Sequence, residues 1–165
     1  MSKINFQVLF VCSGNSCRSP IAEGLLKTKL SENLAGKVNI RSAGTLGING
    51  ARATDLAIQV AAELGTDIQQ HLSQGIEDEL VKNANIVLGM SSEHIAYLIA
   101  YYPEMRENFF LLKAFGREDT HFMSMEIEDP IGGTYEKYKE CSTILNEEIE
   151  RIIPLLEAMM HDKES

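Results

Sequence analysis

The sequence predicts one α/β domain over residues 1–165, built on a four-stranded parallel sheet that is flanked by helices. Four short apolar runs lack polar alternation, which is typical of strands buried on both faces of a sheet. Segments with apolar residues at helical spacing lie between these runs, and strands that alternate with helices form parallel sheets with right-handed crossovers. A chain of 165 residues is also long enough for one domain with a sizeable core.

The elements follow in order from the periodicity of apolar residues and from helix start and stop signals. Pro20 suits the first turn of the first helix, where its missing N–H costs no hydrogen bond. Thr54 and Ser91 can cap later helices, and Pro103 ends the helix that begins at Ser91. The predicted strands are 6–11, 38–41, 86–90 and 109–112, and the predicted helices are 20–34, 54–64, 77–82, 91–102 and 134–160.

The last predicted helix has an apolar face and contains a proline. Pro154 is expected to kink this helix or to loosen its last turns. Cys141 lies on the apolar face and is interpreted as a core residue, whereas His94 and His161 are interpreted as solvated helix residues. The apolar face comprises Tyr138, Cys141, Leu145, Ile149, Ile152, Leu156 and Met159.

Composition limits the partners and the location of the protein. A net charge of −9 argues against a nucleic-acid partner, because phosphate backbones select basic surfaces. The apolar run near the N-terminus spans about six residues, which is too short for a signal sequence or a membrane span. Three unevenly placed cysteines do not suggest a disulfide framework. We therefore predict a cytoplasmic protein with no membrane partner.

The segment VCSGNSCRS, between the first strand and the first helix, carries the chemistry. Small residues such as Gly14 let backbone N–H groups turn inward and form an anion site, which the helix N-terminus strengthens. Arg18 offers a planar fork that matches two oxygens of a phosphoryl group. The anion site, the helix end and Arg18 together favour a thiolate at Cys12. A thiolate beside a phosphate site predicts a nucleophile for phosphoryl transfer.

Other interpretations of this loop fit less well. A nucleotide-binding P-loop requires Gly-Lys-Ser/Thr, and no such lysine occurs here. The spacing of Cys12 and Cys17 allows zinc, but no Cys/His pair completes a site, and it is not the Cys-x-x-Cys spacing of a redox pair. Both cysteines could also be small buried hydrophobes, but the nearby Arg18 and Ser19 disfavour this for Cys12.

Together with Asp129-Pro130 far downstream, the pattern Cys12-x5-Arg18-Ser19-Pro20 resembles the low-molecular-weight protein tyrosine phosphatases. The resemblance covers nearly the whole chain, because RSAGT at 41–45, the strand at 84–90 and DPIGG at 129–133 also match. It implies a flavodoxin-like sheet with the strand order 2-1-3-4 and the phosphate loop after strand 1. It further implies hydrolysis of phosphorylated proteins without a metal or cofactor, by a monomer that binds phosphate or vanadate as an inhibitor.

The resemblance also implies residue roles. Cys12 matches the nucleophile that forms a phosphocysteine, Arg18 the residue that clamps phosphate, and Asp129 the general acid. Ser19 matches a hydroxyl that stabilises the thiolate. Asn15 matches a residue that holds the strained loop together with Ser42 and His71, and Cys17 either shields the nucleophile from over-oxidation or only packs. The implied phosphate-binding loop comprises Ser13, Gly14, Asn15, Ser16, Cys17 and Ser19.

The substrate rim departs from the common family pattern. Members that act on phosphotyrosine usually carry aromatic residues that stack on the substrate ring, whereas this chain has Leu46, Ile48 and Ile131. Ser16 also stands where tyrosine phosphatases often have a bulky apolar residue. Ser16 and the DPIGG segment resemble the bacterial branch that acts on phosphoarginine in proteins. The sequence therefore favours phosphoarginine, with a phosphotyrosine-specific phosphatase as the alternative.

Two further functions are less well supported. A thioredoxin-linked arsenate reductase shares the loop and fold but needs two more cysteines around residues 80–95, and that region contains none. A non-catalytic phosphate-binding module would usually lose the nucleophile, the clamp or the acid, and Cys12, Arg18 and Asp129 are all present.

Overall fold

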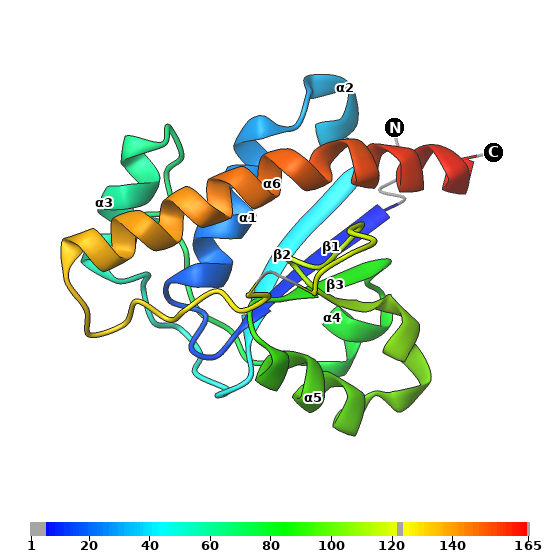
Figure 1. Ribbon diagram of the computed structural model, residues 1–165, viewed down its shortest axis with the longest axis horizontal. Coiled ribbons are helices and arrows are strands. Elements are labelled where there is room, and N and C mark those ends of the chain that lie inside the picture. The colour runs from blue at the N-terminus through cyan, green and yellow to red at the C-terminus, as the bar shows by residue number, and fades with distance from the viewer. Residues whose placement is uncertain (1–5, 122–123, 165) are drawn as a thin grey trace.

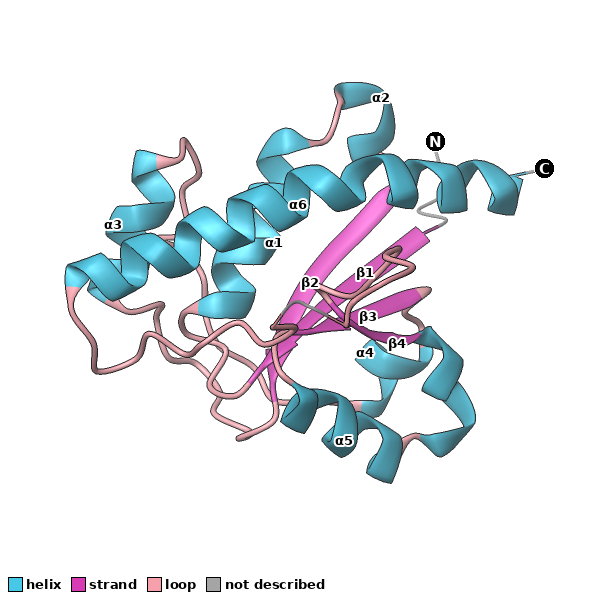
Figure 2. Ribbon diagram, viewed as in Figure 1, coloured by secondary structure: helices cyan, strands magenta, loops and turns pink. Residues whose placement is uncertain are grey.

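The computed structural model describes residues 6–121 and 124–164, and the remainder of the predicted 1–165 domain lies outside the described residues. Four parallel strands form one sheet in the order β2-β1-β3-β4, which confirms the predicted sheet and strand order (Figure 1, Figure 2). In the central strand Val8 lies between Ile40 and Ile86, its partners on the two neighbouring strands. The strands are β1 (Phe6–Cys12), β2 (Val38–Gly44), β3 (Ile86–Gly89) and β4 (Phe109–Leu111).

Helices cover both faces of the sheet, so the strands are buried as their apolar composition predicts (Figure 2). Val8 and Phe10 point to the face covered by α1, α3 and α6, whereas Leu9 and Val11 point to the face covered by α4 and α5. The helices are α1 (Arg18–Lys29), α2 (Glu32–Ala35), α3 (Asp55–Glu63), α4 (Asp78–Lys82), α5 (Ser92–Tyr101) and α6 (Tyr135–Glu164), and η1 (Pro103–Asn108) is a 3-10 helix.

One helix prediction needs correction. The predicted helix 20–34 is two helices, because Leu30 and Ser31 both adopt extended conformations between the end of α1 and the first residue of α2, Glu32. As predicted, the long helix α6 contains Pro154 in its interior, and it continues ten residues beyond this proline. Pro154 lies on the exposed side of α6, where the lost hydrogen bond can be replaced by water. Met160 is the buried methionine at the end of the apolar face, whereas Met159 is half-buried and packs against the core from its edge.

The carboxyl ends of the strands gather the loops that carry the predicted site. The phosphate loop joins β1 to α1, and the segment after β2 packs directly on it. A Cβ at Gly44 would lie 2.6 Å from the carbonyl oxygen of Ser13, so only glycine allows this approach. The N-terminus of α5 and the segment before α6 reach the same edge (Figure 1). This is where ligands bind in open parallel sheets.

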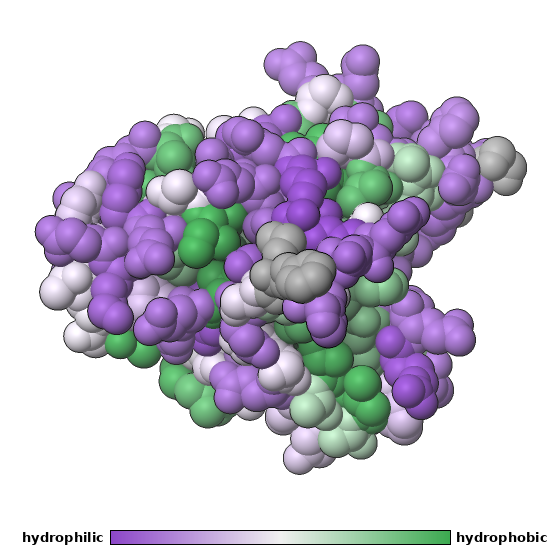
Figure 3. All heavy atoms as spheres, viewed as in Figure 1, coloured by the Kyte–Doolittle hydropathy of each residue, from purple (hydrophilic) through white to green (hydrophobic). Residues whose placement is uncertain are grey.

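One face of the described surface is mostly hydrophilic. Hydrophilic residues cover most of the face that α6 crosses, with smaller hydrophobic patches between them (Figure 3). Within the described ranges 6–121 and 124–164, no helix has both the length and the apolar composition to cross a bilayer.

Candidate active site

The phosphate loop is held from outside by donors that bind its carbonyl groups. The carbonyl oxygens of Cys12 and Ser13 accept hydrogen bonds from the N–H groups of Thr45 and Leu46, both at 3.0 Å. The carbonyl of Ser16 accepts from the N–H of Thr54 at 3.1 Å. In a trans peptide the N–H of the next residue points opposite to the carbonyl. Because these three carbonyl groups point outward, the N–H groups that follow them point inward, toward the cavity that the loop lines.

Asn15 is the central support of the loop. It is fully buried and has a φ of 55°, in the left-handed region that few non-glycine residues adopt. Its side-chain amide donates to the hydroxyls of Ser19 and Ser42, at 2.8 and 2.9 Å. Its side-chain oxygen accepts from the N–H of Gln74, and His71 donates to its main-chain carbonyl at 2.8 Å. Ser42 and His71 therefore lie where loop support was predicted.

Removing the Asn15 side chain should destabilise the protein. Asn15→Ala should lower the free energy of unfolding by about 3 kcal/mol, because buried hydrogen bonds are lost and alanine is strained at this φ. Asn15→Gly, which removes the same side chain but tolerates the backbone conformation, should cost about 1 kcal/mol less. Urea unfolding of both variants measures the two effects. Two variants with the stability of the natural chain would show that Asn15 does not support the loop.

The hydroxyl of Ser19 is oriented toward the thiol of Cys12. Ser19 Oγ accepts from the Asn15 amide, so its own hydrogen is free to be donated to the sulfur of Cys12 at 2.9 Å. Cys12 is almost fully buried, at 2% exposure, at the carboxyl end of β1. A hydroxyl that donates to sulfur stabilises the thiolate form, which is the nucleophilic one.

Arg18 lies in the first turn of α1 and is buried at 2% exposure. Its Nη1 donates to the Ile127 carbonyl at 2.9 Å and to the Ser91 hydroxyl at 3.1 Å. Its Nη2 lies 3.3 Å from both the Ser13 hydroxyl and the Asp129 carboxylate. Within the described part of the chain, nothing accepts a hydrogen bond from the buried Nε. The guanidinium is thus fixed in orientation and retains a buried donor for an anion.

Asp129 meets the phosphate loop across a cavity of about 130 Å³. One carboxylate oxygen pairs with Arg18, and the other accepts from the N–H of Ile131 at 3.1 Å, which fixes the turn. Gly14, Ser16 and Cys17 line the floor of this cavity together with Cys12. The predicted rim residues Leu46, Ile48 and Ile131 line its opening and are exposed.

Cys17 is buried on the side of the loop that faces α3 and α6. Its sulfur lies 3.4 Å from the hydroxyls of both Thr54 and Tyr138. Burial, followed by the hydrogen bond with Cys17, raises the pKa of Tyr138 to about 12, so this hydroxyl stays protonated. Cys12 and Cys17 are both free thiols.

His94 is a site residue that the sequence interpretation missed. It is fully buried rather than solvated, because α5 directs its side chain at the phosphate loop. Its Nδ1 accepts from the N–H of Ser91 at 3.0 Å, and its Nε2 lies 3.0 Å from the Ser13 hydroxyl. One sequence signal indicated this position: His94 follows the helix cap Ser91 by three residues, the spacing of a capping box, and the two residues form one in the structure.

Burial, followed by the nearby charge of Arg18, lowers the pKa of His94 from 6.5 to about 4. The unfolded chain binds a proton at this histidine below about pH 6.5, whereas the folded chain does not until about pH 4. Acid therefore favours unfolding between these values, and the loss should reach about 3 kcal/mol at pH 4.

This acid sensitivity should depend on the imidazole. The free energy of urea unfolding should fall by about 3 kcal/mol more between pH 7 and pH 4 in the natural chain than in His94→Asn. Asparagine offers an oxygen to the N–H of Ser91 but does not titrate. Equal losses in the two proteins would show that His94 does not contribute.

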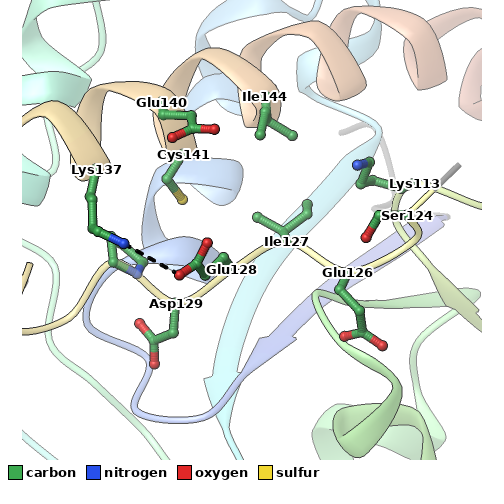
Figure 4. Close-up of a pocket in the computed structure, with 11 residues that line it drawn as sticks. Lys113, Ser124, Glu126, Ile127, Glu128, Asp129, Lys137, Glu140, Cys141 and Ile144 are labelled. Atoms are coloured by element: carbon green, nitrogen blue, oxygen red, sulfur yellow. Dashed lines mark ion pairs between the residues drawn. The ribbon is translucent and has the colours of Figure 1, made fainter.

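A second cavity, of about 400 Å³, lies between the Asp129 segment and α6 (Figure 4). At its opening Glu128 and Lys137 form an ion pair at 3.6 Å. Cys141 lines it from α6, where burial raises the pKa of its thiol to about 12, in agreement with the predicted packing role. Over residues 6–121 and 124–164, no three or more His, Cys, Asp or Glu side chains form a group that could hold a metal ion.

Residues 7–164 match the family described as low molecular weight phosphotyrosine protein phosphatase. The chain belongs to this family.

Relatives in this phosphatase family include enzymes named for different substrates. A protein-arginine-phosphatase of Bacillus subtilis is 33% identical over 140 residues, which cover 85% of this chain and 89% of the relative. The low molecular weight protein-tyrosine-phosphatase Etp of Escherichia coli is 38% identical over 107 residues, 64% of this chain and 69% of the relative. The solved structure of the YwlE arginine phosphatase from Geobacillus stearothermophilus has a TM-score of 0.82 at 32% identity, covering 95% of this chain and 96% of that one.

Proposed function

We propose that this phosphatase hydrolyses phosphoarginine side chains in proteins through a phosphocysteine at Cys12. The observation that carries the proposal is the loop itself, in which a buried thiol, a fixed guanidinium and a carboxylate surround one cavity. Among the relatives reported above, the Bacillus and Geobacillus proteins are named as arginine phosphatases, and they match 85% and 95% of this chain. A cytoplasmic location and a monomeric state stay predictions.

In the first step the Cys12 thiolate attacks phosphorus. Loop amides and Arg18 bind the phosphoryl oxygens and stabilise the charge that builds up on them. The bond from phosphorus to the leaving nitrogen breaks, its electron pair stays on the nitrogen, and Asp129 donates a proton there. Arginine leaves, and the phosphoryl group remains on the sulfur.

In the second step water hydrolyses the phosphocysteine. Asp129, now a carboxylate, takes a proton from the water, whose oxygen attacks phosphorus while the bond to sulfur breaks. The electron pair returns to Cys12 as a thiolate, which the Ser19 hydroxyl stabilises at 2.9 Å. Phosphate is released, so free phosphate and vanadate should compete with substrate for the same cavity.

The rim supports phosphoarginine over phosphotyrosine. Its exposed residues, Leu46, Ile48 and Ile131, are aliphatic and provide no aromatic face to stack on a tyrosine ring. Ser16 lines the cavity with a small polar side chain. The Asp129 carboxyl group lines it too, where its second oxygen could accept a hydrogen bond from a substrate guanidinium.

A comparison of substrates tests this preference. The same protein substrate carrying either phosphoarginine or phosphotyrosine should show a kcat/KM at least about tenfold higher for phosphoarginine. Ser16→Ile should reduce that ratio, because it fills the polar side of the cavity. The phosphotyrosine alternative, which the similarity to Etp favours, predicts the opposite order. A large preference for phosphotyrosine that Ser16→Ile leaves unchanged would exclude the arginine assignment.

A further inference from the structure

The tautomer of His94 follows from its surroundings. Its Nδ1 accepts a hydrogen bond from the N–H of Ser91 at 3.0 Å, so this nitrogen carries no proton. In a neutral imidazole the proton must then be on Nε2. The buried position of His94, which lowers its pKa to about 4, keeps the ring neutral at ordinary pH. His94 Nε2 is therefore a donor, and the group 3.0 Å from it is the Ser13 hydroxyl oxygen.

Ser13 consequently has a defined hydrogen-bond direction. Its oxygen accepts from His94 Nε2 and from Arg18 Nη2, which is 3.3 Å away, and a hydroxyl oxygen has two lone pairs. With both lone pairs used, the Ser13 hydroxyl can make a further hydrogen bond only as a donor. The acceptor in reach is the carboxylate of Glu93 at 3.4 Å, a long contact to a side chain that is 71% exposed.

We propose that His94 is a positioning residue that makes the Ser13 hydroxyl a hydrogen-bond donor to the phosphoryl group in the Cys12 cavity. Ser13 lines that cavity together with Cys12, Arg18 and Asp129. A phosphoryl oxygen is a charged acceptor, and in a partly buried site it competes well with the long contact to solvated Glu93. Ser13 adds a side-chain donor to the loop amides. This inference rests on the proposed phosphatase function.

The hydrogen bonds of His94 exclude a role for Ser13 as a nucleophile. Ser13, His94 and Glu93 resemble the serine–histidine–carboxylate set of many hydrolases, in which the histidine removes the serine proton. Here Nε2 already carries a proton, and Nδ1 accepts from a main-chain N–H instead of donating to a carboxylate. His94 therefore cannot act as a base toward Ser13, and Ser13 is not a nucleophile.

A double-mutant cycle tests the coupling between the two residues. Ser13→Ala should lower kcat/KM for an aryl phosphate about ten- to a hundredfold, the usual effect of losing one hydrogen bond to a charged group. It should weaken vanadate inhibition by a similar factor, because vanadate resembles the transition state. His94→Asn, which keeps an acceptor for the N–H of Ser91, should cause a comparable loss in the natural background. In the Ser13→Ala background the same change should alter kcat/KM less than twofold.

Each outcome decides the inference. A Ser13→Ala variant within twofold of the natural chain, in both kcat/KM and vanadate inhibition, would overturn it. An equal loss from His94→Asn in both backgrounds would show that His94 acts through folding rather than through Ser13. If His94→Asn does not fold, His94→Gln replaces it in the same cycle, because glutamine also offers an oxygen to the N–H of Ser91. Absence of activity in the natural chain on both an aryl phosphate and a phosphoarginine-containing protein would contradict the proposed function itself, which separates the two failures.

Discussion

Replacing Cys12 by serine should lower the turnover of an aryl phosphate by at least about 10⁴-fold. In the proposed mechanism the Cys12 thiolate forms the covalent intermediate, and a serine hydroxyl at neutral pH is a far weaker nucleophile. Phosphate binding should persist, because the loop amides and Arg18 are unchanged and serine is close in size to cysteine. Steady-state kinetics measures the first effect, and calorimetric titration with inorganic phosphate measures the second.

Cys141→Ser is the matched control for this change. Cys141 is also a buried thiol, but it packs on α6 outside the Cys12 cavity, and its raised pKa keeps it protonated. The control should retain activity within a few-fold. Trapping the intermediate in acid should place phosphorus on the sulfur of Cys12. Phosphorus bound to any other residue, or an active Cys12→Ser, would contradict the mechanism.

Replacing Arg18 by lysine should lower kcat/KM by about 10³-fold or more, although the charge is kept. The guanidinium uses separate nitrogens for its tasks: Nη1 holds Ser91 and the Ile127 carbonyl, while Nη2 meets Ser13 and Asp129. Nε remains as a buried donor for an anion. A lysine ammonium is one point charge with three donors, so it cannot hold these partners and two phosphoryl oxygens together.

Kinetics with an aryl phosphate and the inhibition constant of phosphate measure this loss. Arg117→Lys serves as the control, because Arg117 pairs with Glu148 of α6 and does not line the cavity. It should leave kcat/KM unchanged within about twofold. Thermal unfolding of Arg18→Lys distinguishes a folded, inactive enzyme from a misfolded one. A folded Arg18→Lys with normal phosphate inhibition would show that the guanidinium does not bind phosphate.

Local sequence patterns predicted most of the helices and strands, whereas the strand order and the roles of Asp129, Ser42 and His71 came from the family resemblance. Strands and helices followed from apolar periodicity, and the loop between β1 and α1 followed from residue types at fixed spacing. The contact between Ser13 and His94 did not, because the two are 81 residues apart. It exists because β1 and β3 are neighbours in the sheet, so that α5, after β3, begins beside the loop after β1. The break at Leu30 was missed because its apolar side chain still fits the helical period.

The distribution of the loop's anchors links the activity to the integrity of the whole domain. Asn15 is bound by groups from β2, from His71 and from Gln74, and Ser16 by the N–H that precedes α3. These anchors belong to segments that are distant in the chain and that pack on one face of the sheet or along its edge. Opening any one of them frees part of the loop, so partially unfolded forms should hydrolyse nothing. The turnover that remains during denaturation should therefore be proportional to the fraction of native molecules. It should follow the same transition as the spectroscopic signal of global unfolding.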